Sequence, residues 1–258
     1  MRAAFGRWRG PGALREIDRK AGGMKRVCIH QPDFVPYLGF FDRLLSTDVF
    51  ILLDDAQFLR RGWHHRDRIK TRQGSDWLTL PVEKSPQTTP INHMRLAPTS
   101  AGWQANLLNQ LQENYRDAAH FSKEFPWITE LLSGPFERLV DLNLAFLKEC
   151  LRRFELQPEI VLASSLGVAG ARTQRLVDLV RAVGGTSYLS GTGALDYLEP
   201  ERFVEAGITL TIQDFRHPVY PQLHGPFMPY LSCLDALLNC GSDVAEILRA
   251  KNVQETGP

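Results

Sequence analysis

Hydrophobic and polar positions along this chain repeat with the periods of strands and helices. Two apolar runs, Val27–Ile29 and Val49–Leu53, read as buried strands joined by a loop with Pro and Gly and by a short apolar helix. Such a strand–helix–strand unit normally crosses over right-handed and leaves its strands parallel. The carboxyl ends of both strands are then expected at one edge of a sheet.

The same reading extends to the rest of the chain. Trp103, Leu107, Leu111 and Tyr115 recur every four residues, which predicts an amphipathic helix. Further strands are predicted over 77–82, 159–163, 186–190 and 208–212, and further helices over 123–132, 136–154, 172–183, 199–206 and 232–239. We therefore expect an α/β fold, a Rossmann-like mostly parallel sheet with a central helical subdomain over about 101–156, in a single domain over 24–258.

The first 23 residues differ, because arginines and glycines alternate there without an apolar run. We interpret 1–23 as a disordered or non-native extension, with Met24 as a second possible start of translation. The 258 residues carry a net charge of +1, which gives no reason to expect nucleic acid as a partner. No apolar run approaches the roughly 18–20 residues of a membrane span, so no membrane insertion is expected. The four cysteines lack CxxC spacing, which favours a reducing, cytoplasmic location.

Polar side chains follow both opening strands. His30 and Gln31 come after the first, and Asp54, Asp55 and Gln57 come after the second. Because ligands of open α/β sheets bind at the carboxyl edge, these side chains are candidates for a site. His30 could stabilise an anion, and either aspartate could act as a general base. The alternatives are a histidine that fixes the loop and aspartates that are structural. Asp54 and Asp55 are expected on extended backbone, with side chains on opposite sides.

A basic and aromatic segment follows. Arg60, Arg61, Arg66, Arg68 and Lys70 surround Trp63. Arginine suits bidentate binding of phosphate or carboxylate, and Arg66, Arg68 and Lys70 share one face if the segment is extended. A solvated hairpin face is the alternative. The neighbours His64 and His65 cannot readily hold one metal ion from a regular strand, and we expect no obligatory zinc or other cofactor.

Two loops later in the chain combine small residues with hydroxyls. Ser164–Gly167 and Ser190–Gly193 follow apolar strands, where backbone amides can approach a phosphate. Ser190 and Gly191 are therefore candidate binding residues, although neither loop matches a known phosphate-binding motif. The polar loop 213–227 adds Tyr220 and Gln222 as candidates, with ordinary surface polarity as the alternative.

From Lys25 to about Gly241 the chain resembles the WbqC-like family. The motifs that carry the resemblance are His30-Gln-Pro-Asp-Phe-Val-Pro-Tyr-Leu-Gly-Phe-Phe-Asp, Leu53-Asp-Asp-Ala-Gln-Phe, Arg66-Asp-Arg-Ile-Lys-Thr with Gly74 and Trp77-Leu-Thr-Leu-Pro-Val, Tyr188-Leu-Ser-Gly-Thr-Gly-Ala-Leu-Asp-Tyr-Leu, and Leu231-Ser-Cys-Leu-Asp-Ala-Leu-Leu-Asn-Cys-Gly. Members of the family often carry Trp-Gln-Asn-Arg where this chain has Trp63-His64-His65-Arg66.

The resemblance implies a bacterial protein of O-antigen (lipopolysaccharide) or other surface-glycan biosynthesis. It suggests transfer of an aminoacyl group, such as glycyl, or of another acyl group to a nucleotide-linked amino sugar. In that scheme Arg66, Arg68 and Lys70 hold phosphate or carboxylate, His30 supports the anionic transition state, and Asp54 or Asp55 accepts the proton. One alternative is a nucleotidyltransferase of the HIGH type or an ATP-dependent ligase, which would use ATP and magnesium. The other is a non-catalytic module of a glycan-assembly complex.

Overall fold

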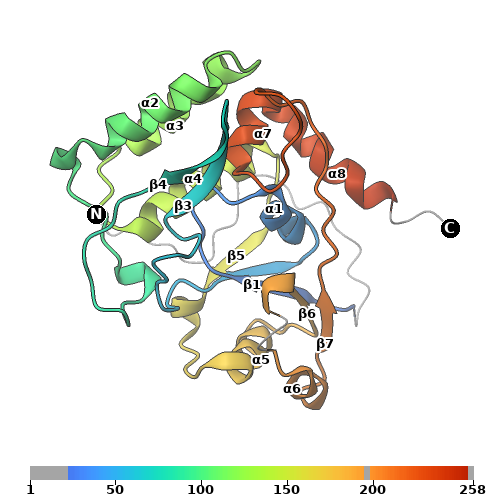
Figure 1. Cartoon of the computed structure of the whole chain (residues 1–258). Coiled ribbons are helices and arrows are strands. Elements are labelled where there is room, and N and C mark those ends of the chain that lie inside the picture. The colour runs from blue at the N-terminus through green and yellow to red at the C-terminus, as the bar shows by residue number, and fades with distance from the viewer. Residues whose placement is uncertain (1–22, 195–197, 255–258) are drawn as a thin grey trace. The chain divides into compact units, whose positions relative to one another are not determined.

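The computed structural model describes residues 23–194 and 198–254 (Figure 1). Residues 1–22 of the predicted extension lie outside the described residues. So do residues 195–197, which belong to the motif that begins at Tyr188. The chain divides into two compact units. Unit 1 contains the chain up to residue 31 together with 42–54 and 157–215, and unit 2 contains 32–41, 55–156 and the chain from 216 onward.

Unit 1 is built on a five-stranded parallel sheet. Its strands are β1 (Arg26–His30), β2 (Val49–Leu52), β5 (Glu159–Leu162), β6 (Ser187–Ser190) and β7 (Thr209–Ile212). The spatial order is β5-β2-β1-β6-β7, and every pairing is parallel. The strand order reverses at β1, because β2 and β5 lie on one side of it and the later strands β6 and β7 lie on the other. The prediction of an α/β fold with a Rossmann-like, mostly parallel sheet is confirmed.

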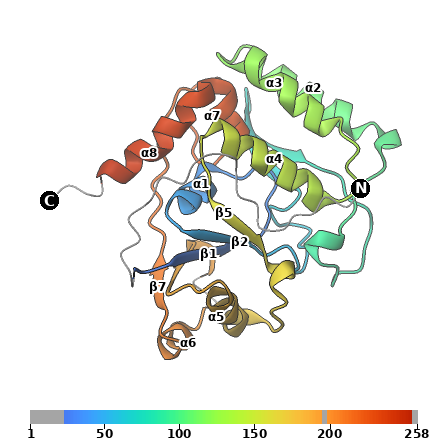
Figure 2. The ribbon, with the colours of Figure 1, turned by 180° about the vertical axis from the view of Figure 1, so that it is seen from behind.

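One face of this sheet packs against two helices. In Figures 1 and 2, α5 (Arg172–Ala182) and α6 (Pro200–Glu205) lie on the same side of the strands. The alternate residues Val27 and Ile29 of β1 join a buried apolar cluster with residues of both helices. The helix predicted over 172–183 is confirmed to within one residue, and the chain leaves it at Gly184, whose backbone adopts φ +69° and whose N–H donates to the carbonyl of Arg181.

The opposite face of β1 carries Cys28 and, by alternation, His30. The short helix α1 (Leu38–Leu45) is shared between the units, with residues 38–41 in unit 2 and 42–45 in unit 1. Short 3-10 turns occur at Ile91–His93, Thr99–Ala101, Ala163–Leu166, Thr192–Ala194 and Gly241–Asp243.

Unit 2 combines a β-hairpin with helices. Strands β3 (Arg66–Thr71) and β4 (Gly74–Thr79) pair in antiparallel register. The predicted strand 77–82 therefore begins and ends three residues earlier. The helices are α2 (Trp103–Tyr115), α3 (Phe121–Leu132), α4 (Leu139–Arg153), α7 (Cys233–Cys240) and α8 (Val244–Gln254). The first three occupy the stretch predicted to be helical.

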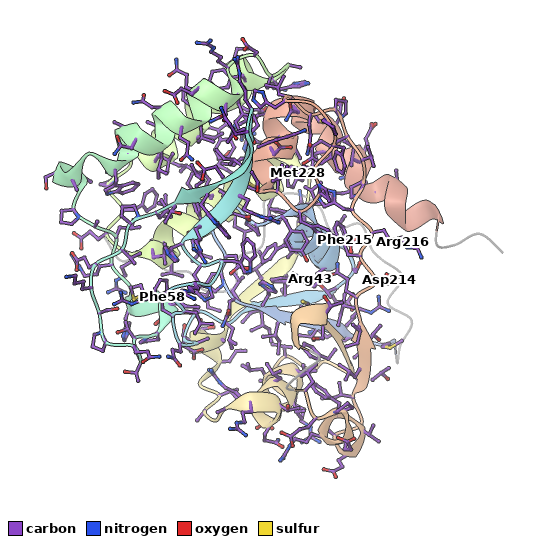
Figure 3. All side chains as sticks on the ribbon, in the orientation of Figure 1. Arg43, Phe58, Asp214, Phe215, Arg216 and Met228 are labelled. Atoms are coloured by element: carbon purple, nitrogen blue, oxygen red, sulfur yellow. The ribbon has the colours of Figure 1, made fainter. Side chains whose placement is uncertain are left out.

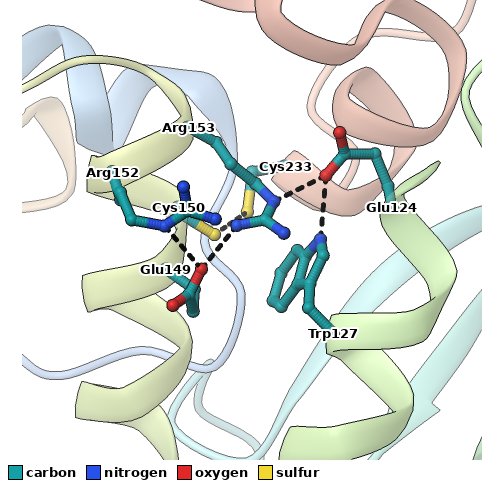
Figure 4. Close-up of polar contacts among 7 residues, drawn as sticks. All are labelled: Glu124, Trp127, Glu149, Cys150, Arg152, Arg153 and Cys233. Carbon is teal, nitrogen blue, oxygen red and sulfur yellow. Dashed lines mark hydrogen bonds and ion pairs between the residues drawn. The ribbon is translucent and has the colours of Figure 1, made fainter.

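Two of these helices are joined by a buried ion-pair network (Figure 4). Arg153 of α4 donates to Glu124 of α3 at 2.6 Å and to Glu149, and its guanidinium lies 4.3 Å from the ring centre of Trp127. Glu124 also accepts from the indole N–H of Trp127 at 2.8 Å. Within the described residues, no helix is both long and apolar enough to cross a membrane.

Candidate functional site

The carboxyl edge of the unit 1 sheet brings four predicted site residues to its reversal point. His30 and Gln31 end β1, and Ser190 and Gly191 end the neighbouring strand β6. Open α/β sheets bind ligands where strand order reverses, because the loops after the two strands diverge there. His30 and Gly191 are partly exposed, whereas Ser190 is buried.

The imidazole of His30 has a defined orientation. Its Nδ1 lies 2.9 Å from the carbonyl oxygen of Gln31. Since a carbonyl oxygen only accepts hydrogen bonds, Nδ1 must carry the hydrogen. In the neutral ring, Nε2 is then the nitrogen that can accept a proton. The neighbouring strand β2 supports the carboxyl end of β1, because the N–H of Leu53, directly after β2, donates to the carbonyl of His30 at 2.8 Å.

A buried arginine lies behind Gly191, and the sequence reasoning missed it. Arg43 of α1, labelled in Figure 3, is 3% exposed. It donates to Oε1 of Gln213 at 2.6 Å. A Cβ added to Gly191 would lie 3.2 Å from Nη1 of Arg43. Burial raises the pKa of Cys28 to about 12, and the adjacent Arg43 lowers this pKa in part. The sequence signal was the charged pair Asp42-Arg43 inside an otherwise apolar helix.

The backbone at Asp54 and Asp55 forms a turn, so the prediction of extended backbone is wrong. The strand ends at Leu52, and the chain must change direction directly after it. Asp54 is 3% exposed, and its two oxygens accept from the N–H of Ser164 at 3.0 Å and from its hydroxyl at 2.6 Å. Asp54 thus connects the ends of β2 and β5, and a catalytic role for it stays a prediction.

In unit 2, three of the predicted binding residues come together around a buried carboxylate. Lys70, 2% exposed, donates from Nζ to Gln222 Oε1 at 3.0 Å and to the carbonyls of Gly225 and Pro226 at 3.3 and 2.6 Å. Asp235 accepts from the amide of Gln222 and the hydroxyl of Tyr220, both at 2.9 Å.

The hydroxyl of Tyr115 completes this network. It donates to Asp235 at 2.8 Å and accepts from the backbone N–H of Lys70 at 2.8 Å. Desolvation raises the pKa of Asp235, while the hydrogen bonds and the charge of Lys70 lower it. Tyr115 was missed because it continues the apolar stripe of α2, and Asp235 was missed because a single acidic residue near the start of a helix is ordinarily a solvated one. The three donors of the Lys70 ammonium all have acceptors in the chain, so contact of Lys70 with substrate stays a prediction.

The remaining predicted residues of unit 2 lie nearer its surface. Arg66 and Arg68 are on one face of β3, partly exposed, and Trp63 is 45% exposed. Gln57 is exposed and donates to the carbonyl of Gln87 at 2.8 Å, and Asp55 is partly exposed. No group of three His, Cys, Asp or Glu side chains that could hold a metal ion occurs in the described part of the chain.

The two neighbouring histidines are both buried. His64 is 2% exposed and its Nδ1 lies 3.3 Å from Asp33. Burial, with the adjacent charges of Arg66 and His64, lowers the pKa of His65 from 6.5 to about 4. His65 is therefore neutral at physiological pH.

The chain is similar in sequence to a known protein family. The sequence model of the WbqC-like protein family matches residues 31–247. The chain belongs to this family. The matched range begins directly after His30 and covers Gln31, the loop after β6 and the hairpin of β3 and β4. The family predicted from the sequence is confirmed.

A relative of the chain is known in Mycobacterium tuberculosis. Uncharacterized protein Rv1507c of Mycobacterium tuberculosis is 32% identical over 231 residues, which is 88% of this chain and 98% of that protein. No solved structure shows a significant match to the chain. Membership of the WbqC-like family thus rests on sequence along nearly the whole length, and the chemistry has to be argued from the site.

Proposed function

We propose that this protein is an enzyme of bacterial surface-polysaccharide (O-antigen) biosynthesis. It binds a nucleotide-linked amino sugar at the carboxyl edge of the unit 1 sheet and transfers an aminoacyl group, such as glycyl, or another acyl group to the sugar amine. The observation that carries the proposal is that His30–Gln31 and Ser190–Gly191 stand at the carboxyl ends of neighbouring strands, at the strand-order reversal. Membership of the WbqC-like family supports the class of substrate.

The loop after β6 is suited to the phosphates of a nucleotide. Gly191 and Gly193 have no side chain, so the backbone N–H groups of this loop can approach an anion closely. Arg43 adds a positive charge directly behind Gly191, in a buried setting where the attraction is only weakly screened. This charge favours a phosphate group over a neutral ligand at the same loop.

His30 is the proposed proton acceptor. The sugar amine attacks the carbonyl carbon of an activated acyl donor, a C–N bond forms, and the bond from that carbon to its leaving group breaks with the electron pair on the leaving group. The proton lost by the attacking nitrogen passes to Nε2 of His30, because Nδ1 already carries a hydrogen that is bonded to Gln31. Asp54 is assigned to positioning, since Ser164 occupies both of its oxygens.

The experiment is a thermal-shift titration of the full chain. Its ligands are UDP-glucosamine, UDP-N-acetylglucosamine, UDP, and ATP with and without magnesium. A ligand at 100-fold its Kd stabilises the folded state by about 2.7 kcal/mol. We expect stabilisation by UDP-glucosamine that is reduced in Gly191→Val and retained in Val204→Ala, a control on an exposed residue of α6.

Turnover is then measured with the stabilising sugar nucleotide and coenzyme A thioesters or aminoacyl esters, by mass spectrometry of the product. We expect His30→Ala to keep the thermal shift and to lose at least a hundredfold in rate. Stabilisation by ATP with magnesium alone would replace the proposal by the nucleotidyltransferase or ligase. A sugar nucleotide that binds without turnover with any donor would favour the non-catalytic module.

A further inference from the structure

The exposed face of the unit 2 hairpin, together with the turn before it, carries two tryptophans beside two arginines. Trp63 and Trp77 are 45% and 38% exposed, and their ring centres lie 5.4 Å apart with planes tilted by 45°. By contrast, Trp103 and Trp127 of the same unit are buried, with exposed fractions of 7% and 8%. Indole rings contribute large apolar surface, and their exposure side by side marks a place where another molecule can cover them.

The arginines belong to the same face. Arg68 is directly opposite Trp77 in the strand register, and Arg66 lies two residues away on β3. The guanidinium of Arg66 lies 4.2 Å from the ring centre of Trp77, which fixes both groups by a cation–π contact. We call Trp63, Trp77, Arg66 and Arg68 the tryptophan–arginine surface.

Each of these arginines uses one terminal nitrogen within the described residues; both Nε atoms are buried, so the remaining terminal N–H groups are the donors that the surface offers. Arg66 donates from Nη2 to the carbonyl of Arg61 at 2.8 Å, and Arg68 donates from Nη2 to the carbonyl of Tyr230 at 3.4 Å. A guanidinium has five donors, in a planar arrangement that matches a carboxylate or a phosphate. The surface therefore offers apolar ring faces and anion-binding groups within one patch.

From this combination we propose that the tryptophan–arginine surface binds a saccharide that bears a carboxylate or a phosphate. The apolar C–H face of a sugar ring covers the indoles, and the anionic group binds Arg66 and Arg68. The inference rests on the proposed function, because it assigns the glycan partner of an enzyme of polysaccharide biosynthesis. Nucleic acid fits less well: the chain has a net charge of only +1, and Asp76 is adjacent to Trp77.

The experiment follows the indole N–H signals of the full ¹⁵N-labelled chain by NMR, assigned with Trp63→Phe and Trp77→Phe. The ligands are tetragalacturonate for the carboxylate, mannose 6-phosphate for the phosphate, neutral maltotetraose, and an octathymidine strand. Arg68→Gln is compared with Arg72→Gln, an exposed arginine of the same hairpin that lies outside the surface. An unchanged urea midpoint shows that each variant is folded.

We expect an anionic saccharide to shift the signals of Trp63 and Trp77 while those of Trp103 and Trp127 stay in place. Arg68→Gln should weaken binding at least tenfold, Arg72→Gln less than twofold, and maltotetraose should bind at least tenfold more weakly. No shift with any saccharide up to about 10 mM overturns the proposal. A shift with the thymidine strand alone, or equal binding of charged and neutral sugars, also overturns it.

The saccharide titration and the thermal-shift titration with sugar nucleotides can fail independently of each other. If sugar nucleotides stabilise the protein through Gly191 and no saccharide reaches the tryptophans, only the inference about this surface is wrong. If an acidic saccharide binds the surface and no nucleotide stabilises the protein, the surface stands and the proposed function is wrong.

Discussion

Replacement of Lys70 by Met should strongly destabilise unit 2. The substitution keeps the apolar stem of a side chain that is only 2% exposed and removes its ammonium group. Gln222 Oε1 and the carbonyls of Gly225 and Pro226 then lose a donor. Asp235, which is fully buried, loses the positive charge that helps to keep it ionised.

The size of the effect follows from these contacts. Removing one partner of a buried charged network costs about 3–5 kcal/mol, since the other charge remains without compensation. Total stabilities of domains are about 5–15 kcal/mol, so this is a large fraction. With a urea m value of about 2 kcal/mol/M, the midpoint should fall by roughly 1.5–2.5 M.

The loss of stability caused by Lys70→Met should depend on pH. Burial raises the pKa of Asp235 above 3.8, so the folded state binds a proton more readily than the unfolded state does. Without Lys70 this pKa rises further, and protonation then removes the uncompensated charge. The destabilisation should therefore be full at about pH 8 and shrink as pH falls through the raised pKa toward 3.8.

The assay is urea unfolding followed by tryptophan fluorescence. Four of the five tryptophans of the chain belong to unit 2, and the fifth, Trp8, lies outside the described residues, so the change in signal on unfolding reports mainly on unit 2. Lys84→Met, at an exposed lysine, serves as the control and should change stability by less than about 0.5 kcal/mol. A Lys70→Met cost below about 1 kcal/mol, or a cost of equal size at about pH 8 and at pH 3.8, would refute the reasoning.

Three further predictions concern other buried contacts. Arg153→Ala should lower the free energy of unfolding by about 3–5 kcal/mol, because Arg153 is 14% exposed within the network of Figure 4. In the same urea assay, Arg152→Ala should lower it by less than about 1 kcal/mol, because that side chain is 66% exposed. Ser164→Ala removes the hydroxyl hydrogen bond to the buried carboxylate of Asp54, while the backbone N–H bond remains, and should speed amide exchange in β5 in mass-spectrometric measurements; equal acceleration in Ser165→Ala would contradict this. The low pKa of His65 means that the unfolded chain binds its proton first, so stability should fall as pH drops from 6.5 to about 4, and a stability profile equally steep in His65→Gln would count against it.

The sequence predicted the parts of the fold that depend on apolar periodicity. The central strands β1 and β2 contain continuous apolar runs, which is typical of a parallel sheet covered on its faces, and this signal located both strands correctly. Strand β3 was harder, because its composition, Arg66 to Thr71, is charged on one face. Its extended form depends on pairing with β4 and on burial of Ile69, which neighbouring residues alone do not specify.

The site was predicted in part for a related reason. Residues that directly follow strands, such as His30 and Gly191, are visible in a sequence because their position sets their role. The partners of buried groups are not visible: Tyr115 lies 45 residues from Lys70 and 120 from Asp235. Such pairs form only when the tertiary structure brings distant segments together, so a single sequence does not reveal them.

The arrangement of unit 1 along the chain has a consequence for its synthesis on the ribosome. Strand β1 is made early, but its neighbour β6 pairs Ser187 with Arg26, so 187 − 26 = 161 residues separate the two. At about 5–20 residues per second, one edge of β1 waits on the order of 8–32 s for its partner. An apolar strand with an open edge is prone to associate with other chains during that time. Expression yield should therefore depend on chaperones and on translation speed between β2 and β6 more than on the stability of the finished sheet.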